Sequence, residues 1–289
     1  MANKINAKLV SGFLPSRDDN SNKGSFGKVL NISGSDSYSG AAFLSSKASL
    51  KVGAGYVMLA CPENIISRIA PSLPELVFYP LKQNQEGSIA LENKISDLYN
   101  YDVVAIGCGL TTNSDTQQFV MKIIKEFNTH QKVVIDADAI NILSLHKGEL
   151  SIKNSIITPH PKELARLLNV DLADVIENRE KYARISAQTY ECITVLKGKN
   201  TIVTDGEKIY INTTGNSALS KAGTGDVLTG MIAGFLSQKV SPFKAAILSV
   251  FLHGLAGDIA SDDLTKFSVL ASDVIDYIPY AISEIMDAE

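Results

Sequence analysis

The chain has 289 residues, of which 45% are hydrophobic and 20% are charged, and its formal net charge is −4. This composition is typical of a globular protein with a large core, and the slightly negative charge excludes a general attraction to nucleic acid or to an anionic membrane. Cys61, Cys108 and Cys192 fit neither a disulfide framework nor a metal-binding pattern, which favours a reducing compartment. The N-terminus resembles no signal peptide and no run of about 18 apolar residues occurs, so we expect a cytoplasmic protein without a membrane span.

Apolar segments with the spacing of strands and of helices alternate along most of the chain. After a polar lead-in at 11–27, we expect strands at 28–33, 56–60, 76–79, 102–106, 132–135, 155–158 and 192–196. We expect helices between them at 41–52, 64–70, 114–127, 140–145, 162–168 and 174–190. Asp205-Gly206-Glu207 predicts a hairpin between 201–204 and 208–212, and the rest predicts helices after Asp226, at 241–260 and at 268–286.

Continuous apolar strands that alternate with helices predict a parallel sheet covered on both faces. The expected fold class is therefore α/β, with three αβα layers around a mainly parallel central sheet. No Pro/Ser-rich linker, charge block or internal repeat divides the sequence, so residues 1–289 are expected to form a single domain.

Sheets of this kind bind ligands beyond the carboxyl ends of their strands. Glycine-rich and polar loops follow the predicted strand ends, and all of them are expected to face one crevice: 34–40, 107–110, 136–138, 158–163 and 197–201. Residues 223–226 should join them at the start of the next helix. The agreement among these separate loops predicts an active site.

The turn Ala222-Gly223-Thr224-Gly225-Asp226 precedes an apolar helix. Its glycines let the backbone approach a ligand, and the free N–H groups of a first helical turn suit a phosphate or an oxyanion. Asp226 has two interpretations, an N-cap residue or a general base near a hydroxyl that attacks a phosphate. The glycines on either side of Thr224 favour the base.

Each of the other candidates also has a structural interpretation beside a functional one. Cys108 fits a small packing residue in a tight turn, and the two aspartates of 136–138 fit caps of the next helix, which is the interpretation we favour. His160, between two prolines, fits a histidine bonded to backbone as well as it fits a ligand contact. Lys197-Gly198-Lys199 fits a solvated turn or a nucleotide contact, and His253 is expected to be a satisfied core or interface residue.

Together these stretches resemble the ribokinase-like superfamily and, within it, the ADP- or ATP-dependent NAD(P)H-hydrate dehydratases. The most specific part of the resemblance combines Gly223-Thr224-Gly225-Asp226, similar to the anion-hole motif, with Thr158-Pro159-His160-Pro161. We expect no fused epimerase domain, which precedes this domain in some relatives. The resembling stretches span roughly residues 24 to 260 and include 34–42, 107–110, 136–139, 158–163, 195–201, 214–216, 222–230 and 252–258.

The sequence departs from the family's pattern at several positions. The glycine loop commonly reads Gly-Pro-Gly-Leu-Gly, whereas here Cys108 replaces the proline and Thr111 the last glycine, which predicts a looser loop. Ser217 stands where a proline is common, and Ser220 and Lys221 stand where small residues are usual. Lys221 is expected either to add a positive charge beside the phosphates or to point to solvent.

The resemblance implies a substrate whose reduced nicotinamide ring carries a hydroxyl at C6, namely the S epimer of NADHX or NADPHX. Such enzymes phosphorylate this hydroxyl from ADP or ATP, and phosphate then leaves as the ring nitrogen pushes electrons in. Asp226 would accept the hydroxyl proton. The N–H groups of Gly223, Thr224 and Gly225 would stabilise the transferring phosphoryl group.

The resemblance also assigns the binding residues. The hydrated nicotinamide is expected near Ala42, Gly109, His160 and Asp226. The adenine nucleotide is expected on Lys197, Gly198, Lys199, Asn200, Thr201 and Gly225. Mg²⁺ is expected to bridge the nucleotide phosphates, with Glu163 holding one of its waters.

Two other functions remain open at this point. A small-molecule kinase of the same superfamily, acting on a vitamin precursor or a sugar, would share Asp226 and the anion hole, although the residues around His160 argue against it. A sensor that binds ADP or NAD(P) without turnover would have no use for Asp226.

The expected assembly is a homotetramer, as is common among the resembling dehydratases. Related sugar kinases close their site with a small β-lid, but residues 30–56 predict a single βαβ unit with no room for one. A neighbouring subunit is therefore expected to exclude water from the site. The helix at 241–260 is apolar on more than one side, which fits either a subunit contact or the core of one subunit.

Overall fold

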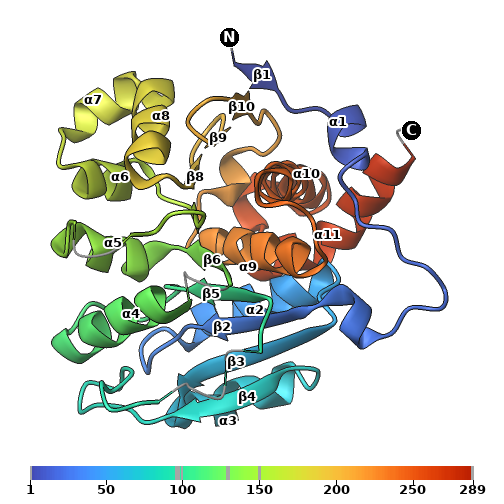
Figure 1. The fold of residues 1–289 in the computed structure, drawn as a ribbon. Coiled ribbons are helices and arrows are strands. Elements are labelled where there is room, and N and C mark those ends of the chain that lie inside the picture. Colours follow the sequence, from blue (N-terminus) through green and yellow to red (C-terminus); the bar gives the residue numbers. More distant parts are fainter. Residues whose placement is uncertain (1, 95–97, 99, 128–130, 149–150, 288–289) are drawn as a thin grey trace.

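A ten-stranded sheet runs through the middle of the computed structural model, which describes residues 2–94, 98, 100–127, 131–148 and 151–287 (Figure 1). The strands lie in the order β1-β10-β9-β8-β7-β6-β5-β2-β3-β4, and β9 alone runs antiparallel to its two neighbours. Their bounds are β1 Asn3–Lys4, β2 Lys28–Ile32, β3 Tyr56–Pro62, β4 Val77–Leu81, β5 Val103–Ile106, β6 Lys132–Ile135, β7 Ile156–Ile157, β8 Ile193–Leu196, β9 Ile202–Thr204 and β10 Ile209–Ile211.

Helices cover both faces of this sheet (Figure 1), which confirms the predicted three-layer αβα arrangement. One face carries α1 Ala7–Ser11, α2 Ser39–Lys51, α3 Glu63–Ile69, α9 Thr224–Ser237, α10 Pro242–Ser268 and α11 Ala271–Met286. The other face carries α4 Ser114–Phe127, α5 Ala137–Leu145, α6 Pro161–Leu168, α7 Leu172–Glu177 and α8 Arg179–Tyr190. Short 3-10 turns lie at Lys23–Phe26, Ala70–Ser72 and Ser217–Leu219.

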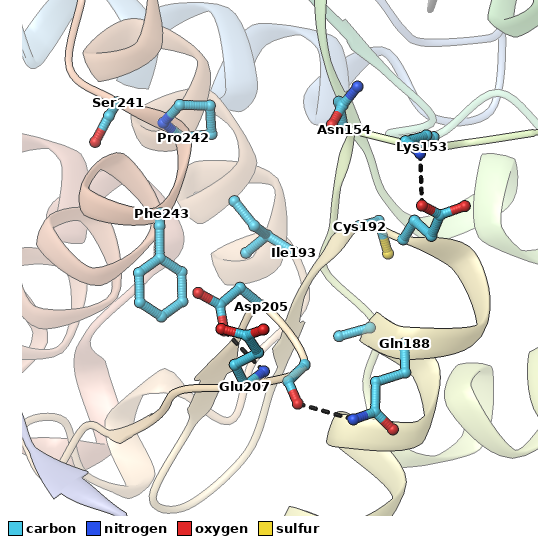
Figure 2. A pocket seen from close by; sticks show the side chains of 13 residues that line it. Lys153, Asn154, Gln188, Cys192, Ile193, Asp205, Glu207, Ser241, Pro242 and Phe243 are labelled. Atoms are coloured by element: carbon cyan, nitrogen blue, oxygen red, sulfur yellow. Dashed lines mark hydrogen bonds and ion pairs between the residues drawn. The ribbon is translucent and has the colours of Figure 1, made fainter.

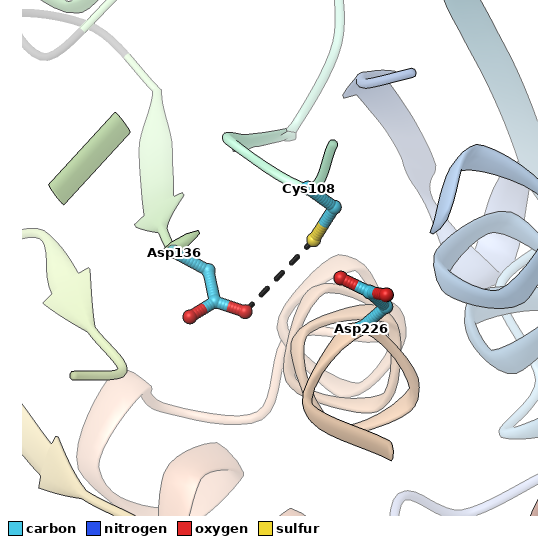
Figure 3. Close-up of side chains that lie close together, drawn as sticks. All are labelled: Cys108, Asp136 and Asp226. Atoms are coloured by element: carbon cyan, nitrogen blue, oxygen red, sulfur yellow. Dashed lines mark hydrogen bonds between the residues drawn. The ribbon is translucent and has the colours of Figure 1, made fainter. Parts of the chain in front are cut away.

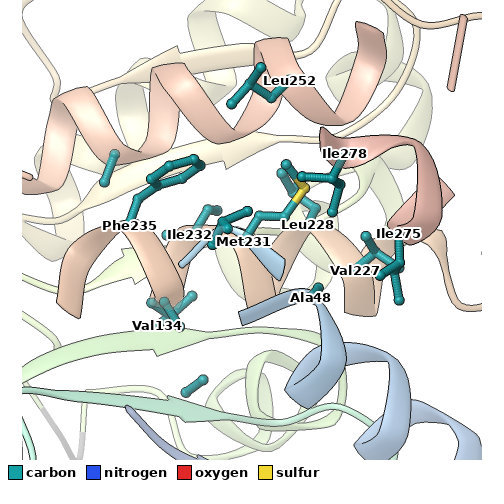
Figure 4. Close-up of a cluster of buried hydrophobic side chains, with 14 of the residues drawn as sticks. Ala48, Val134, Val227, Leu228, Met231, Ile232, Phe235, Leu252, Ile275 and Ile278 are labelled. Carbon is teal, nitrogen blue, oxygen red and sulfur yellow. The ribbon is translucent and has the colours of Figure 1, made fainter. Parts of the chain in front are cut away.

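Helix α9 lies at the centre of the larger core, between the sheet and the helices α10 and α11 (Figure 4). The sequence predicted one buried face, but nearly every residue of α9 is buried, because α2 also packs closely against it. A Cβ on Gly230 would lie 2.1 Å from the carbonyl oxygen of Ser45, so only glycine permits this approach. The core therefore fixes the direction of α9 and the position of its first turn.

The observed elements differ from the predicted ones at a few places. The helix predicted at 174–190 is divided into α7 and α8, because the backbone at Asn178 leaves helical geometry (φ −123°, ψ 49°). Residues 3–11 contain strand β1, paired with β10, and helix α1, which the sequence did not predict. Helix α10 extends beyond residue 260 to Ser268, with a non-helical residue at Thr265 (φ 67°).

Helix α10 is long and apolar enough to cross a membrane by length and composition, but 67% of its most apolar window is buried inside the protein. Its apolar side chains belong to the same core as α9. Of the two explanations offered for this helix, the core of one subunit therefore accounts for its apolar surface, and that surface gives no support to a subunit contact.

The chain reverses its direction of travel across the sheet between β2 and β5. From β2 it proceeds through β3 to β4 at one edge, and from β5 it proceeds through β6 and β7 toward the other edge. The loops after these two strands meet, because Gly34 donates its N–H to the carbonyl of Cys108 at 2.8 Å. A reversal point of this kind is where open α/β sheets bind ligands, so we expect the binding crevice beside these two loops.

Candidate active site

The loops predicted to share one crevice do come together at the carboxyl edge of the sheet. A Cβ on Gly107 would lie 1.8 Å from the carbonyl oxygen of Asp136, so the loops after β5 and β6 are in direct contact. Lys197 donates its backbone N–H to the carbonyl of Pro159 at 2.9 Å, which joins the loops after β7 and β8. Helix α9 reaches the same place through its second turn, since Thr229 donates to Asp136.

Helix α9 begins with Gly223 as its N-cap, in a left-handed conformation (φ 93°). Asp226 is therefore the third residue of the helix, and the interpretation of Asp226 as the N-cap is wrong. The hydroxyl of Thr224 donates to the carbonyls of Leu219 and Lys221, at 2.9 and 3.0 Å, and so holds the turn that leads into the helix. The first N–H groups of α9 have no acceptor within the helix, which leaves them available to an anion.

A buried ion pair lies beside this turn. Lys197 Nζ is 2.6 Å from Asp136 Oδ1, and Thr229 donates to Asp136 Oδ2 at 2.7 Å. Burial alone would raise the pKa of Asp136, but the ammonium of Lys197 and the hydrogen bonds that Asp136 accepts hold that pKa below its ordinary value. Asp136 does occupy the N-cap position of α5, as the favoured interpretation predicted, but its side chain makes no capping hydrogen bond and bonds to Lys197 and Thr229 instead.

Three side chains converge beside this turn: those of Asp136, Asp226 and Cys108 (Figure 3). One carboxylate oxygen of each aspartate and the Sγ of Cys108 all lie within 4.8 Å of one another. Burial, and then the charge of Asp136, raise the pKa of Asp226 to about 6, while the thiol of Cys108 lowers it. Burial, and then the charges of Asp226 and Asp136, raise the pKa of Cys108 well above its ordinary value, so the thiol keeps its proton. Cys108 is thus a hydrogen-bond donor beside two carboxylates, rather than only a packing residue.

His160 is the N-cap of helix α6. Its Nδ1 accepts the backbone N–H groups of Lys162 and Glu163 at 3.1 and 3.2 Å, and Glu163 Oε2 accepts the N–H of His160 at 2.8 Å. This capping box confirms the structural interpretation of His160 without testing a ligand contact. Burial lowers the pKa of His160 and raises that of Glu163 to about 7.

The loops expected to hold the hydrated nicotinamide pack tightly against each other. Gly109 has φ 65°, and a Cβ there would lie 2.6 Å from Cβ of Tyr38. Ala42 is fully buried in the first turns of α2, behind Gly34. In this part of the described structure the hydroxyl of Ser35 is buried without a hydrogen-bond partner.

Two of the residues that depart from the family's pattern, Thr111 and Lys221, form hydrogen bonds. Thr111 adopts φ 68°, where glycine is preferred, but its N–H donates to Asp138 and its hydroxyl bonds to Ser88 and Asn113. These hydrogen bonds hold Thr111 in place, and the prediction of a looser loop stays a prediction. Lys221 donates to the carbonyl of Phe267 at 2.6 Å in an exposed position, which does not decide between the two alternatives predicted for it.

His253 differs from the prediction of a satisfied core residue. Its Nε2 is buried without a hydrogen-bond partner among the described residues. Burial lowers its pKa to about 4, so the imidazole is neutral at physiological pH. Sequence reasoning also missed the roles of Asp136 and Thr229, because nothing in their spacing indicates that they meet Lys197.

A cavity of about 660 Å³ lies at the opposite edge of the sheet, beside the amino end of β8 and the start of α10 (Figure 2). It is lined by Gln188, Glu191, Asp205, Glu207 and Phe243 among others. Asp205 and Glu207 belong to the β9–β10 turn, and Glu191 forms an ion pair with Lys153 at 2.6 Å. The residues that converge at the carboxyl edge do not line this cavity, so its size does not make it the candidate active site.

Comparison with known proteins identifies the family of this chain. A profile of the NAD(P)H-hydrate dehydratase family matches residues 29–280. The chain is 34% identical to the ADP-dependent (S)-NAD(P)H-hydrate dehydratase of Bacillus subtilis, over 93% of this chain and 94% of that protein. It is 36% identical to the bifunctional NAD(P)H-hydrate repair enzyme Nnr of Moorella thermoacetica, over 93% of this chain. The chain spans about half, 52%, of that bifunctional relative.

Solved structures give the same answer for the fold. The crystal structure of the ADP/ATP-dependent NAD(P)H-hydrate dehydratase from Bacillus subtilis, co-crystallised with ATP/Mg²⁺, matches with a TM-score of 0.83 and 30% identity, over 98% of this chain and 99% of that one. A ribokinase-like superfamily protein from Enterococcus faecalis matches with a TM-score of 0.86 and 25% identity, over 98% of this chain and 96% of that one. The fold is ribokinase-like, and the chain belongs to the NAD(P)H-hydrate dehydratase family.

Proposed function

We propose that this protein dehydrates the S epimer of hydrated NADH or NADPH to the reduced cofactor, using ADP or ATP as phosphoryl donor. The observation that carries the proposal is the position of Asp226, a carboxylate with a pKa of about 6 in the first turn of a buried helix. A general base works best with a pKa near the operating pH, and a helix N-terminus favours the phosphate groups. Family membership supplies the substrate class.

The proposed reaction has two steps. Asp226 accepts the proton of the C6 hydroxyl while the hydroxyl oxygen attacks the terminal phosphorus of the nucleotide. The bond between this phosphorus and the rest of the nucleotide breaks, and the nucleotide leaves with one phosphate fewer. The C6–O bond of the phosphorylated intermediate then breaks, phosphate departs with the electron pair, and the ring nitrogen supplies electrons to the ring. A neighbouring ring carbon loses a proton, which restores the double bond of the reduced nicotinamide.

The N–H groups of Gly223, Thr224 and Gly225 are proposed to stabilise the charge on the transferring phosphoryl group. Lys197 supports the same role with its side chain, because a Cβ on Gly225 would lie only 3.4 Å from Lys197 Nζ. We therefore propose a further function for Lys197, which the sequence assigned to nucleotide binding alone. Its ammonium would balance the charge of Asp136 before the phosphoryl group arrives.

Mg²⁺ is proposed to enter with the nucleotide, as the co-crystallised ATP/Mg²⁺ of the Bacillus subtilis relative suggests. When bound, it would neutralise charge on the phosphates. Mg²⁺ held by phosphates needs only one or two carboxylates and keeps several waters, which fits the acidic groups present. Glu163 stays the proposed partner of a Mg²⁺ water, although its two oxygens already lie within reach of His160, at 2.8 and 3.2 Å.

The division of the crevice between the two ligands also stays a proposal. Ala42, Gly109, His160 and Asp226 are assigned to the hydrated nicotinamide, and the loops after β2 and β5, which lead to Ala42 and contain Gly109, meet at the reversal point of the sheet. The adenine nucleotide is assigned to 197–201 together with Gly225. A homotetramer, a single domain over residues 1–289 and a cytoplasmic location remain predictions from the sequence.

The proposal is tested by incubating the protein with hydrated NADH, Mg²⁺ and either ADP or ATP while following the near-ultraviolet absorbance of reduced nicotinamide. We expect the absorbance to return only when a nucleotide is present. A stable phosphorylated product without recovered absorbance would point to a small-molecule kinase. Tight nucleotide binding without product or phosphate release would point to a sensor.

A further inference from the structure

The division between α7 and α8 has a consequence for the loop 197–201. Because the backbone turns at Asn178, Arg179 becomes the first residue of α8 rather than a residue in the middle of a continuous helix. Its guanidinium lies against the carbonyl side of the loop that follows β8. The break therefore places the planar guanidinium of Arg179, which has five N–H donors, against the five-residue loop 197–201.

Arg179 contacts three backbone carbonyls of this one segment. Its Nη2 donates to the carbonyls of Leu196 and Lys197 at 3.1 and 3.2 Å, and its Nη1 donates to the carbonyl of Lys199. The backbone at Gly198 has φ 134°, and a Cβ there would lie 3.2 Å from Nη2. Glycine thus lets the loop close on the guanidinium.

These contacts set the direction of two peptide planes. A peptide unit is planar and trans, so its N–H points opposite to its carbonyl. When Arg179 holds the carbonyls of Lys197 and Lys199, the N–H groups of Gly198 and Asn200 must point away from the guanidinium. Neither of these N–H groups has an acceptor among the described residues. Backbone N–H groups left free in this way can bind an anion or a hydrogen-bond acceptor of a base.

We propose that Arg179 is a positioning residue for the adenine nucleotide, acting through the loop 197–201 without touching the nucleotide itself. This inference rests on the assignment of the nucleotide to that loop in the proposed function. Arg179 holds the carbonyls back and presents the N–H groups of Gly198 and Asn200 to the nucleotide. It also fixes the backbone of Lys197, whose side chain reaches Asp136 beside the catalytic turn.

The chain offers a matched control on the same helix. Arg184 also donates to two backbone carbonyls, those of Gly206 and Glu207, each at 2.7 Å. These carbonyls belong to the β9–β10 turn at the opposite edge of the sheet, away from 197–201. Arg184→Lys therefore removes the same kind of contact without altering the nucleotide loop.

The experiment measures the Kd of ADP with Mg²⁺ by titration calorimetry for the wild type, Arg179→Lys, Arg179→Gln and Arg184→Lys, together with Tm and the KM values of both substrates. A lysine cannot hold three carbonyls in a fixed fork, so Arg179→Lys and Arg179→Gln should raise the Kd and KM of ADP by about tenfold. The KM of the hydrate should stay within about twofold, and Arg184→Lys should leave both nucleotide constants unchanged.

Unchanged ADP binding in the folded Arg179 variants would overturn the inference. So would an equal loss of Tm and of ADP affinity in the Arg179 and Arg184 variants, because that result indicates a structural role only. Calorimetry needs no turnover. A wild type that binds ADP but dehydrates nothing would therefore refute the proposed function, while the ADP affinities of the variants would still test the positioning role of Arg179. A wild type that binds no adenine nucleotide would overturn both.

Discussion

Lys197 Nζ lies 2.6 Å from Asp136 Oδ1, and this ion pair joins the ends of β8 and β6 beside the first turn of α9. The side chain of Asp136 is 1% exposed and that of Lys197 is 19% exposed. The pair therefore links the loop assigned to the nucleotide with the carboxylate that neighbours Asp226.

Removing the ammonium should destabilise the protein. Lys197→Met leaves the buried charge of Asp136 uncompensated, which should lower the free energy of unfolding by about 3–5 kcal/mol. Urea denaturation measures this change. The control is Lys153→Met, which breaks an ion pair whose side chains are 55% and 62% exposed, and which should cost less than about 1 kcal/mol. Equal losses in the two variants would contradict a special role for the buried pair.

Asp226→Asn should separate activity from stability. Loss of a general base should reduce dehydration by roughly 100-fold or more. The pKa of Asp226 in the folded protein, about 6, lies above its ordinary value of 3.8, so its contribution to stability is present at low pH and is lost as the pH rises through about 6. The variant should therefore be more stable than the wild type near pH 8, by about 2 kcal/mol or less, and this advantage should shrink toward about pH 4.

Urea unfolding of Asp226→Asn and the wild type at both pH values provides the measurement. Near-normal dehydration in the variant would remove Asp226 from the mechanism. A stability advantage that is the same at both pH values would contradict the raised pKa.

Cys108→Ala should alter the pH dependence of the reaction. The thiol lowers the pKa of Asp226, so its removal should raise that pKa. Since the base must be ionised, the acidic limb of kcat/KM should move to higher pH. Cys192→Ala serves as the control, because Cys192 is buried beside Thr194 and should leave the limb in place. An acidic limb that is identical in the Cys108 variant and the wild type would exclude this contact from the mechanism.

Substitutions of His160 should distinguish capping from substrate binding. Asn is a good N-cap residue, so His160→Asn should keep the stability of the wild type, whereas His160→Ala should lose about 1 kcal/mol. Both variants should raise the KM of the hydrate if the imidazole contacts it. Thermal unfolding and steady-state kinetics measure the two effects separately. If His160→Asn shows an unchanged KM, the histidine is a cap and not a substrate contact.

Much of the architecture could be predicted, because strand and helix periodicities are local properties of the sequence. The carboxyl ends of β2, β5, β6, β7 and β8 follow from those periodicities, and with them the loops that share the crevice. The break at Asn178 could not be predicted, since the apolar spacing continues through it. The contacts that follow the break are tertiary, as Arg179 bonds to a segment that lies 17 to 20 residues later in the chain.

The individual roles within the site were harder to predict than its location. Asp226 was found from the glycines before it, but its exact place in the helix depends on the left-handed conformation of Gly223. Asp136 is of a residue type that is typical of helix caps, but its side chain bonds to Lys197, which is 61 residues away in the sequence. Such pairings depend on which strands become neighbours in the sheet, and residue spacing does not carry that information.

The most direct test of the central claim is the stoichiometry of products from hydrated NADH and ADP, measured for the wild type and Asp226→Asn. The account predicts one inorganic phosphate for each reduced cofactor recovered by the wild type, and both products reduced in parallel by roughly 100-fold or more in the variant. Reduced cofactor formed without phosphate, or phosphate released from ADP at the same rate when no hydrate is present, would contradict it.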